Sequence, residues 1–148
     1  MKKNLKRWTT LLLTLLLIGT TLVPAHAAQS EETISPRLNT NINATCIPNL
    51  PDSGILYVTN TYGVNDSRIT QIVVTTYVQK RTLLVIWSRV DIGTPNNEWV
   101  DYGTNGHFAV SHSAQMPAPG TYRVVATFDI YSGSTLLDSL EIKLNVEY

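Results

Sequence analysis

From about residue 41 onward the chain alternates between apolar and polar residues. In its last stretch, residues 136–148, most apolar positions share one face, and the other face holds Leu137, Ser139, Glu141, Lys143, Asn145 and Glu147. The apolar set is Leu136, Leu140, Ile142, Leu144, Val146 and Tyr148. A period of two predicts a half-buried antiparallel strand with this set against a core. Residues 121–131 alternate in the same way, and Ser132-Gly133-Ser134 predicts a hairpin loop between the two strands.

Further alternating stretches, separated by Gly, Pro and Asn, predict the other strands, and none shows a helical period. They are residues 41–47, 55–62, 68–79, 83–92, 98–102 and 107–113. Lys80-Arg81 marks either a turn or an exposed kink within one long strand. Seven or eight strands of this kind predict an all-β domain over residues 41–148, folded as an antiparallel sandwich or barrel.

The first 40 residues follow a different pattern. Lys2, Lys3, Lys6 and Arg7 precede an apolar run over residues 11–23, and Ala25-His26-Ala27 then gives the small-x-small pattern of a signal-peptidase site. We therefore expect a signal peptide over residues 1–27, a polar leader over residues 28–40, and a secreted mature protein. An uncleaved membrane anchor is the alternative, but the run is short for a spanning helix.

Removal of the signal peptide changes the charge of the chain. Four of the 11 basic residues lie in residues 1–27 and none of the 11 acidic residues do, so seven basic and 11 acidic residues remain. This balance argues against nucleic acid or anionic lipid as the main partner. The single cysteine, Cys46, excludes an intramolecular disulfide, and we expect it to be a small buried residue rather than a reactive thiol.

Catalytic and metal-binding patterns are weak in this sequence. His107 and His112 lie five positions apart, so a strand would point them to opposite faces, and no nucleophile elbow accompanies the nearby Asp101, Ser111 or Ser113. Two histidines and a distant cysteine do not complete a zinc site. Calcium stays open, because oxygen-bearing side chains gather near one loop without an ordered acidic motif. They are Asp91, Asn96, Asn97, Glu98 and Asp101. We expect no catalytic residues, metal or cofactor.

Aromatic residues form the better candidate contact set. Trp99, Asp101 and Tyr102 follow a polar loop and would place rings beside hydrogen-bond acceptors, as carbohydrate-binding sandwiches do. The competing interpretation puts Trp87 and one of Trp99 or Tyr102 in the core, because sandwiches commonly bury a tryptophan.

Two resemblances add to this picture. Residues 119–127, with Tyr122 near the strand start, resemble the penultimate strand of immunoglobulin-like and fibronectin-type-III-like domains, where such a tyrosine bonds back to the preceding corner. The layout of the whole chain resembles that of uncharacterised small secreted proteins of Gram-positive bacteria, many of them Firmicutes. The shared features are a signal peptide followed by Ser35-Pro36-Arg37, Val78-Gln79-Lys80, a tryptophan and residues 120–123. That resemblance implies location and an immunoglobulin-like fold, but no activity.

These observations together predict an exported, non-catalytic β-sandwich. It would act by surface contacts with cell-wall glycan or another protein, without nucleic acid and without stable membrane insertion once the signal is removed. A structural or self-associating envelope component is the alternative, and a small secreted hydrolase is a weaker one. Exposed Trp and Tyr side chains in one patch would favour the binding protein. A long unpaired edge strand near residues 41–47 would favour the self-associating component. A pocket that joins a His, a Ser and an acidic residue would favour the hydrolase.

Overall fold

The computed structural model describes residues 41–83 and 85–148, and the predicted signal peptide and leader lie outside them. The described chain is all-β, with one short 3-10 turn, η2 (Pro95–Asn97). Its strands are β1 (Ile42–Asn49), β2 (Ile55–Val64), β3 (Gln71–Arg81), β4 (Trp87–Arg89), β5 (Glu98–Gly103), β6 (Gly106–Gln115), β7 (Thr121–Ser132) and β8 (Thr135–Glu147). Each predicted alternating stretch except residues 83–92 lies mostly within one of these strands, whereas residues 83–92 contain only the three-residue β4.

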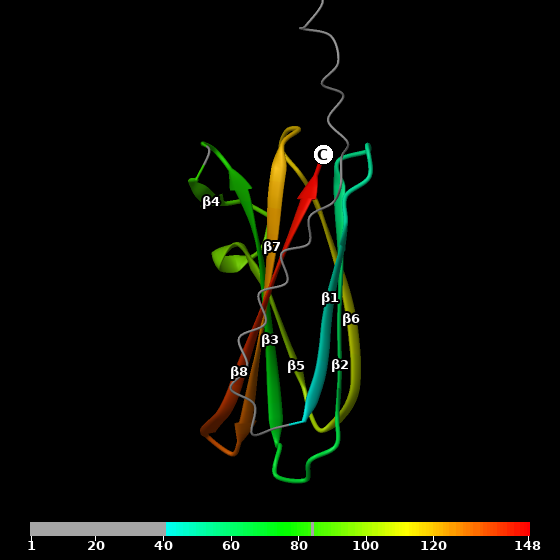
Figure 1. Cartoon of the computed structure of the whole chain (residues 1–148), viewed down its shortest axis with the longest axis vertical. Coiled ribbons are helices and arrows are strands. Elements are labelled where there is room, and N and C mark those ends of the chain that lie inside the picture. Colours follow the sequence, from blue (N-terminus) through cyan, green and yellow to red (C-terminus); the bar gives the residue numbers. More distant parts are fainter. Residues whose placement is uncertain (1–40, 84) are drawn as a thin grey trace, which may run out of the picture.

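The strands form two antiparallel sheets, which confirms the predicted sandwich. One has three strands in the order β1-β2-β6, and the other has the order β4-β3-β7-β8, with β5 also paired to β3. Figure 1 shows the three-stranded sheet on the right and β3, β7 and β8 on the left. The chain passes between the sheets from β2 to β3, from β5 to β6 and from β6 to β7, which is the interleaved connectivity of immunoglobulin-like sandwiches.

The core lies between the sheets and is built by the even-numbered positions of most strands. Leu56 and Val58 on β2 face Ile72, Val74 and their neighbours on the other sheet, and all four are fully buried. A side chain of this size contributes about 1.5–3 kcal/mol when removed from water. The two sheets therefore close over one continuous hydrophobic cluster without a disulfide.

Tyr122 anchors the entry to β7. Its side chain is fully buried, and its hydroxyl donates a hydrogen bond to the backbone carbonyl of Ala118, four residues upstream. The corner between β6 and β7 is thereby fixed to the sheet that follows it. This is the contact that the resemblance to immunoglobulin-like domains implies for Tyr122.

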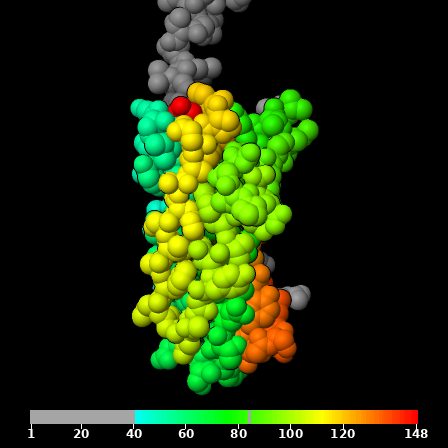
Figure 2. Space-filling view, turned by 180° about the vertical axis from the view of Figure 1, so that it is seen from behind, coloured from blue at the N-terminus to red at the C-terminus, as the bar shows by residue number. Residues whose placement is uncertain are grey.

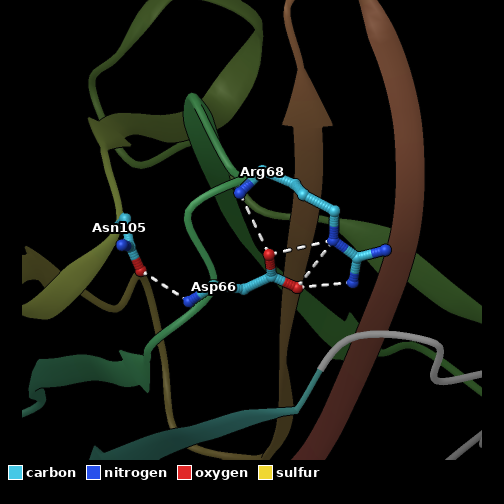
Figure 3. A network of polar contacts seen from close by, with 3 residues as sticks. All are labelled: Asp66, Arg68 and Asn105. Atoms are coloured by element: carbon cyan, nitrogen blue, oxygen red, sulfur yellow. Dashed lines mark hydrogen bonds and ion pairs between the residues drawn. The ribbon is translucent and has the colours of Figure 1, made fainter.

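A small polar network ties two turns together at the end of the sandwich opposite the C-terminus (Figure 3). Asp66 accepts hydrogen bonds from the backbone nitrogen and guanidinium of Arg68, and its own backbone nitrogen donates to Asn105 Oδ1. The hydrogen bonds from Arg68 lower the pKa of the Asp66 carboxyl to about 2. The network holds the β2–β3 turn against the β5–β6 turn, so its role here is structural.

The structure decides between two alternatives and corrects one detail of the predicted strands. Lys80-Arg81 precedes a turn and not a kink in one long strand, because β3 ends at Arg81 and pairs antiparallel with the short β4. Leu136 does not face the core and is 51% exposed. The register slips between Ile130 and Tyr131, so Leu136 pairs with Tyr131, whose side chain lies on the outer face. Such a bulge reverses the face of every position beyond it.

Candidate binding surface on the three-stranded sheet

The three candidate contact residues on β5 do not form one patch. Trp99 is 8% exposed and belongs to the core cluster, whereas Tyr102 is 65% exposed on the outer face. Asp101 shares the inward side with Trp99, because side chains alternate along the strand. The competing interpretation puts Trp87 and one of Trp99 or Tyr102 in the core, and it holds for Trp99 but not for Trp87.

Trp99 and Asp101 instead bridge the gap between the sheets at one side of the sandwich. The Trp99 ring stacks on the His112 ring of β6, with 5.0 Å between centroids and 5° between planes. His112 Nε2 lies 2.8 Å from Asp101 Oδ2. Figure 2 views this side, where β6 in yellow lies beside β5 in lime. The trio closes this edge of the core.

The same contacts separate the residues that a hydrolytic triad would need. His112 points inward to Trp99 and Asp101, while Ser111 and Ser113 lie on the exposed face of the same strand. Ser111 Oγ lies 2.9 Å from Thr59 Oγ1. His107 is also exposed, on the side of β6 opposite to His112, as the five-residue spacing predicts.

The three carboxylates among the residues considered for calcium contact separate groups. Glu98 pairs with Arg89, Asp101 contacts His112, and Asp91 accepts a hydrogen bond from the backbone nitrogen of Gly93. Among residues 41–83 and 85–148, no group of three or more His, Cys, Asp or Glu side chains is placed to hold a metal ion.

Trp87 and Cys46 take different environments. Trp87 does not lie in the core. It is half-buried on the outer face of the five-stranded sheet, where the Arg123 guanidinium lies 3.8 Å from its ring centroid. Cys46 is 6% exposed on β1, and burial raises the pKa of its thiol to about 12. A thiol that stays protonated in an apolar site is a poor nucleophile.

The outer face of the three-stranded sheet is free of charge, and we call it the neutral face. It is formed by odd-numbered positions of β1, β2 and β6, none of which is Asp, Glu, Lys or Arg. Its residues are Asn43, Thr45, Ile47, Asn49, Ile55, Tyr57, Thr59, Thr61, Gly63, His107, Ala109, Ser111, Ser113 and Gln115. The outer face of the other sheet carries charge on every strand, including Arg81, Arg89, Glu98, Arg123, Asp129, Glu141 and Lys143.

Hydroxyl groups on the neutral face are held in cross-strand pairs. Thr45 Oγ1 lies 2.6 Å from Thr61 Oγ1, and Thr59 Oγ1 lies 2.9 Å from Ser111 Oγ. Because neighbouring strands are about 4.8 Å apart, these pairs form short rows across the sheet. Tyr57 adds a ring that is 47% exposed on the same face.

One half of the neutral face is hollowed. A depression of about 690 Å³ runs over the ends of β1, β2 and β6, with amide, hydroxyl and imidazole groups on its rim. The absence of a side chain at Gly63 leaves room for the His107 ring, which lies across this position, 3.0 Å from where a Cβ would stand. The hollow is shallow, and it can accept a ligand that lies along the strands.

Sequence reasoning missed the neutral face, although its signal was present. The odd positions of the first two strands and of residues 107–113 carry no charge, but the three segments become neighbours only through the pairing of β2 with both β1 and β6.

Comparisons with known proteins add no assignment: no protein-family model matches the chain, and a search of curated proteins finds no similar sequence. Among the described residues, no helix has the length and apolar character needed to cross a membrane.

Proposed function

We propose that this protein is an exported, non-catalytic binding module that contacts a neutral glycan through the neutral face. The observation that carries the proposal is the absence of charge across a three-stranded sheet face that also holds paired hydroxyls and a hollow. Export rests on the predicted signal peptide, and the partner rests on the chemistry of this face.

A neutral glycan suits the neutral face for an energetic reason. When a sugar binds, its hydroxyl and acetamido groups lose hydrogen bonds to water and gain hydrogen bonds to Thr, Ser, Asn and Gln side chains. The net change in free energy for this exchange is small. A charged side chain on that face would have to lose its hydration without a counter-charge, which costs more. Tyr57 offers a ring on which a sugar ring can stack.

A charge placed at the centre of the neutral face is expected to lower retention strongly. Thr61→Lys puts an ammonium between Thr45 and Ala109, its partners in register, and should lower retention on peptidoglycan, chitin or cellulose by about tenfold or more. The matched control is Thr75→Lys, at the centre of β3, where Val100 and Thr127 are the partners in register. Retention is measured by pull-down, with thermal unfolding as the check on folding.

Equal retention of the Thr61→Lys and Thr75→Lys proteins would contradict the neutral face as the contact surface. A wild-type protein that none of the polysaccharides retains would remove the glycan proposal altogether.

Self-association is the second candidate, and the edge strand β1 favours it. Within the described residues β1 pairs with β2 only, runs for eight residues and carries no charged side chain. Long uncharged edges tend to pair with other chains. Under this alternative, sedimentation velocity would show oligomers of the wild type, and Ile47→Lys, at a position 60% exposed, would return them to monomers. A monomer at all concentrations would exclude it.

A further inference from the structure

The hairpin between β3 and β4 exposes apolar side chains at its end. Leu83, Val85 and Ile86 are 65%, 83% and 48% exposed, and none belongs to the core cluster. The Thr82 backbone nitrogen donates to the Ile86 carbonyl at 2.9 Å, which closes the hairpin beneath them. We call these three residues the apolar tip. Figures 1 and 2 show the hairpin projecting from the end of the molecule that holds the C-terminus.

Basic residues surround the base of the same hairpin. Lys80 and Arg81 end β3, and Arg123 lies on β7 opposite Gln79. The hydrogen bonds described for these three cations go to uncharged acceptors: Ala118 O, Thr121 Oγ1 and Asn145 Oδ1. We call Lys80, Arg81 and Arg123 the basic collar. Arg89, also nearby, is paired with Glu98.

Trp87 lies at the level of the basic collar, next to the apolar tip. It pairs in register with Arg81, and the Arg123 guanidinium stacks over its ring. The order along the hairpin is therefore apolar side chains first, and then a level that holds the indole together with Arg81 and Arg123. A bilayer surface presents hydrocarbon first and then an interface where tryptophan is enriched and anionic headgroups lie.

From this arrangement we propose that the apolar tip and basic collar dock reversibly on a lipid bilayer containing anionic headgroups. The tip enters the boundary of the acyl chains to a depth on the order of 5–10 Å, and the collar contacts headgroup phosphates. This surface is separate from the neutral face, so the inference does not depend on glycan binding. It differs from a spanning anchor, because only a hairpin end enters the lipid.

The charge distribution favours an anionic lipid surface over a second copy of the chain or a neutral glycan. The chain after the signal has more acidic than basic residues, which argues against an anionic partner for the surface as a whole. Three of its seven basic residues nevertheless form this collar. Two acidic residues lie in the same region. Glu147 is in register with Thr121, and Glu98 forms an ion pair with Arg89. A second copy docking tip to tip would bring two basic collars together, and a neutral glycan offers no apolar surface to the tip.

Vesicle sedimentation tests the proposal with protein collected after export, its processed form identified by intact mass. We expect it to bind vesicles of equal parts phosphatidylglycerol and phosphatidylcholine, to bind phosphatidylcholine vesicles weakly, and to lose affinity as salt rises. Leu83→Asp with Val85→Asp should lower the partition coefficient by roughly two orders of magnitude. Arg81→Gln with Arg123→Gln should lower it by about 30-fold, because each cation near an anionic surface contributes about fivefold.

Matched exposed positions away from the hairpin provide the control. Leu136→Asp and Tyr102→Asp replace side chains that are 51% and 65% exposed, and should leave the partition coefficient within about twofold. No sedimentation of the wild type, or equal losses in the tip and control variants, would overturn the proposal. So would an oligomer formed without lipid that the tip variant dissociates, because the tip would then bind a second copy.

Discussion

Replacing Trp99 with alanine is expected to lower the free energy of unfolding by about 3–5 kcal/mol. The ring is 8% exposed, and it stacks on His112 where β5 and β6 meet at one edge of the sandwich. Removal leaves a cavity between β5 and β6 and exposes the core beneath it. Urea unfolding followed by circular dichroism measures the change.

Tyr102→Ala, on the same strand, is the control for this experiment. Its side chain is 65% exposed, so the free energy of unfolding should change by no more than about 0.5 kcal/mol. Similar small effects at both positions would mean that Trp99 lies on the surface, as a ligand-contacting tryptophan would.

Two leucines on β8 are expected to differ sharply, although both lie at even positions. Leu140→Ala should destabilise the protein by about 2–5 kcal/mol, because the side chain is 7% exposed in the core. Leu136→Ala should change the free energy of unfolding by about 0.5 kcal/mol or less, because the bulge turns this side chain, 51% exposed, to the outer face. The same denaturation measurement applies, and equal losses at the two positions would contradict the bulge.

The strands were predictable because burial imposes a period of two that local sequence reveals. Ile142 and Leu144 alternate with Glu141 and Lys143, and nothing beyond neighbouring residues is needed to see it. The bulge was not predictable in this way. The run Leu136-Leu137 offers two apolar positions of opposite parity, and only pairing with Ile130 and Tyr131 decides which one faces inward.

The tryptophans show a related limit. Trp87 and Trp99 both sit in predicted strands, and alternation alone does not say which side of a strand faces the second sheet. Pairing in register with Thr76, which is buried, sends Trp99 inward, whereas pairing with the exposed Arg81 sends Trp87 outward. Both pairings depend on β3, and sequence alternation does not determine the register between strands.

The neutral face and the apolar tip were hidden for different reasons. The neutral face needs β2 and β6 side by side, and more than 40 residues separate them in the chain. The apolar tip resembled a buried strand, because a short apolar run gives the same local signal in a core and at a hairpin end. Lys80-Arg81, which predicted a turn as one of two alternatives, was the local sign of the hairpin.

The central claim is that the neutral face meets a neutral glycan, and an NMR titration tests it most directly. Isotope-labelled protein is titrated with a soluble hexamer of N-acetylglucosamine, and amide chemical shifts are followed residue by residue. The proposal predicts saturable changes confined to β1, β2 and β6 and centred on Thr61. Changes confined to β3, β4, β5 and β7, or no changes at the highest glycan concentration, would contradict it.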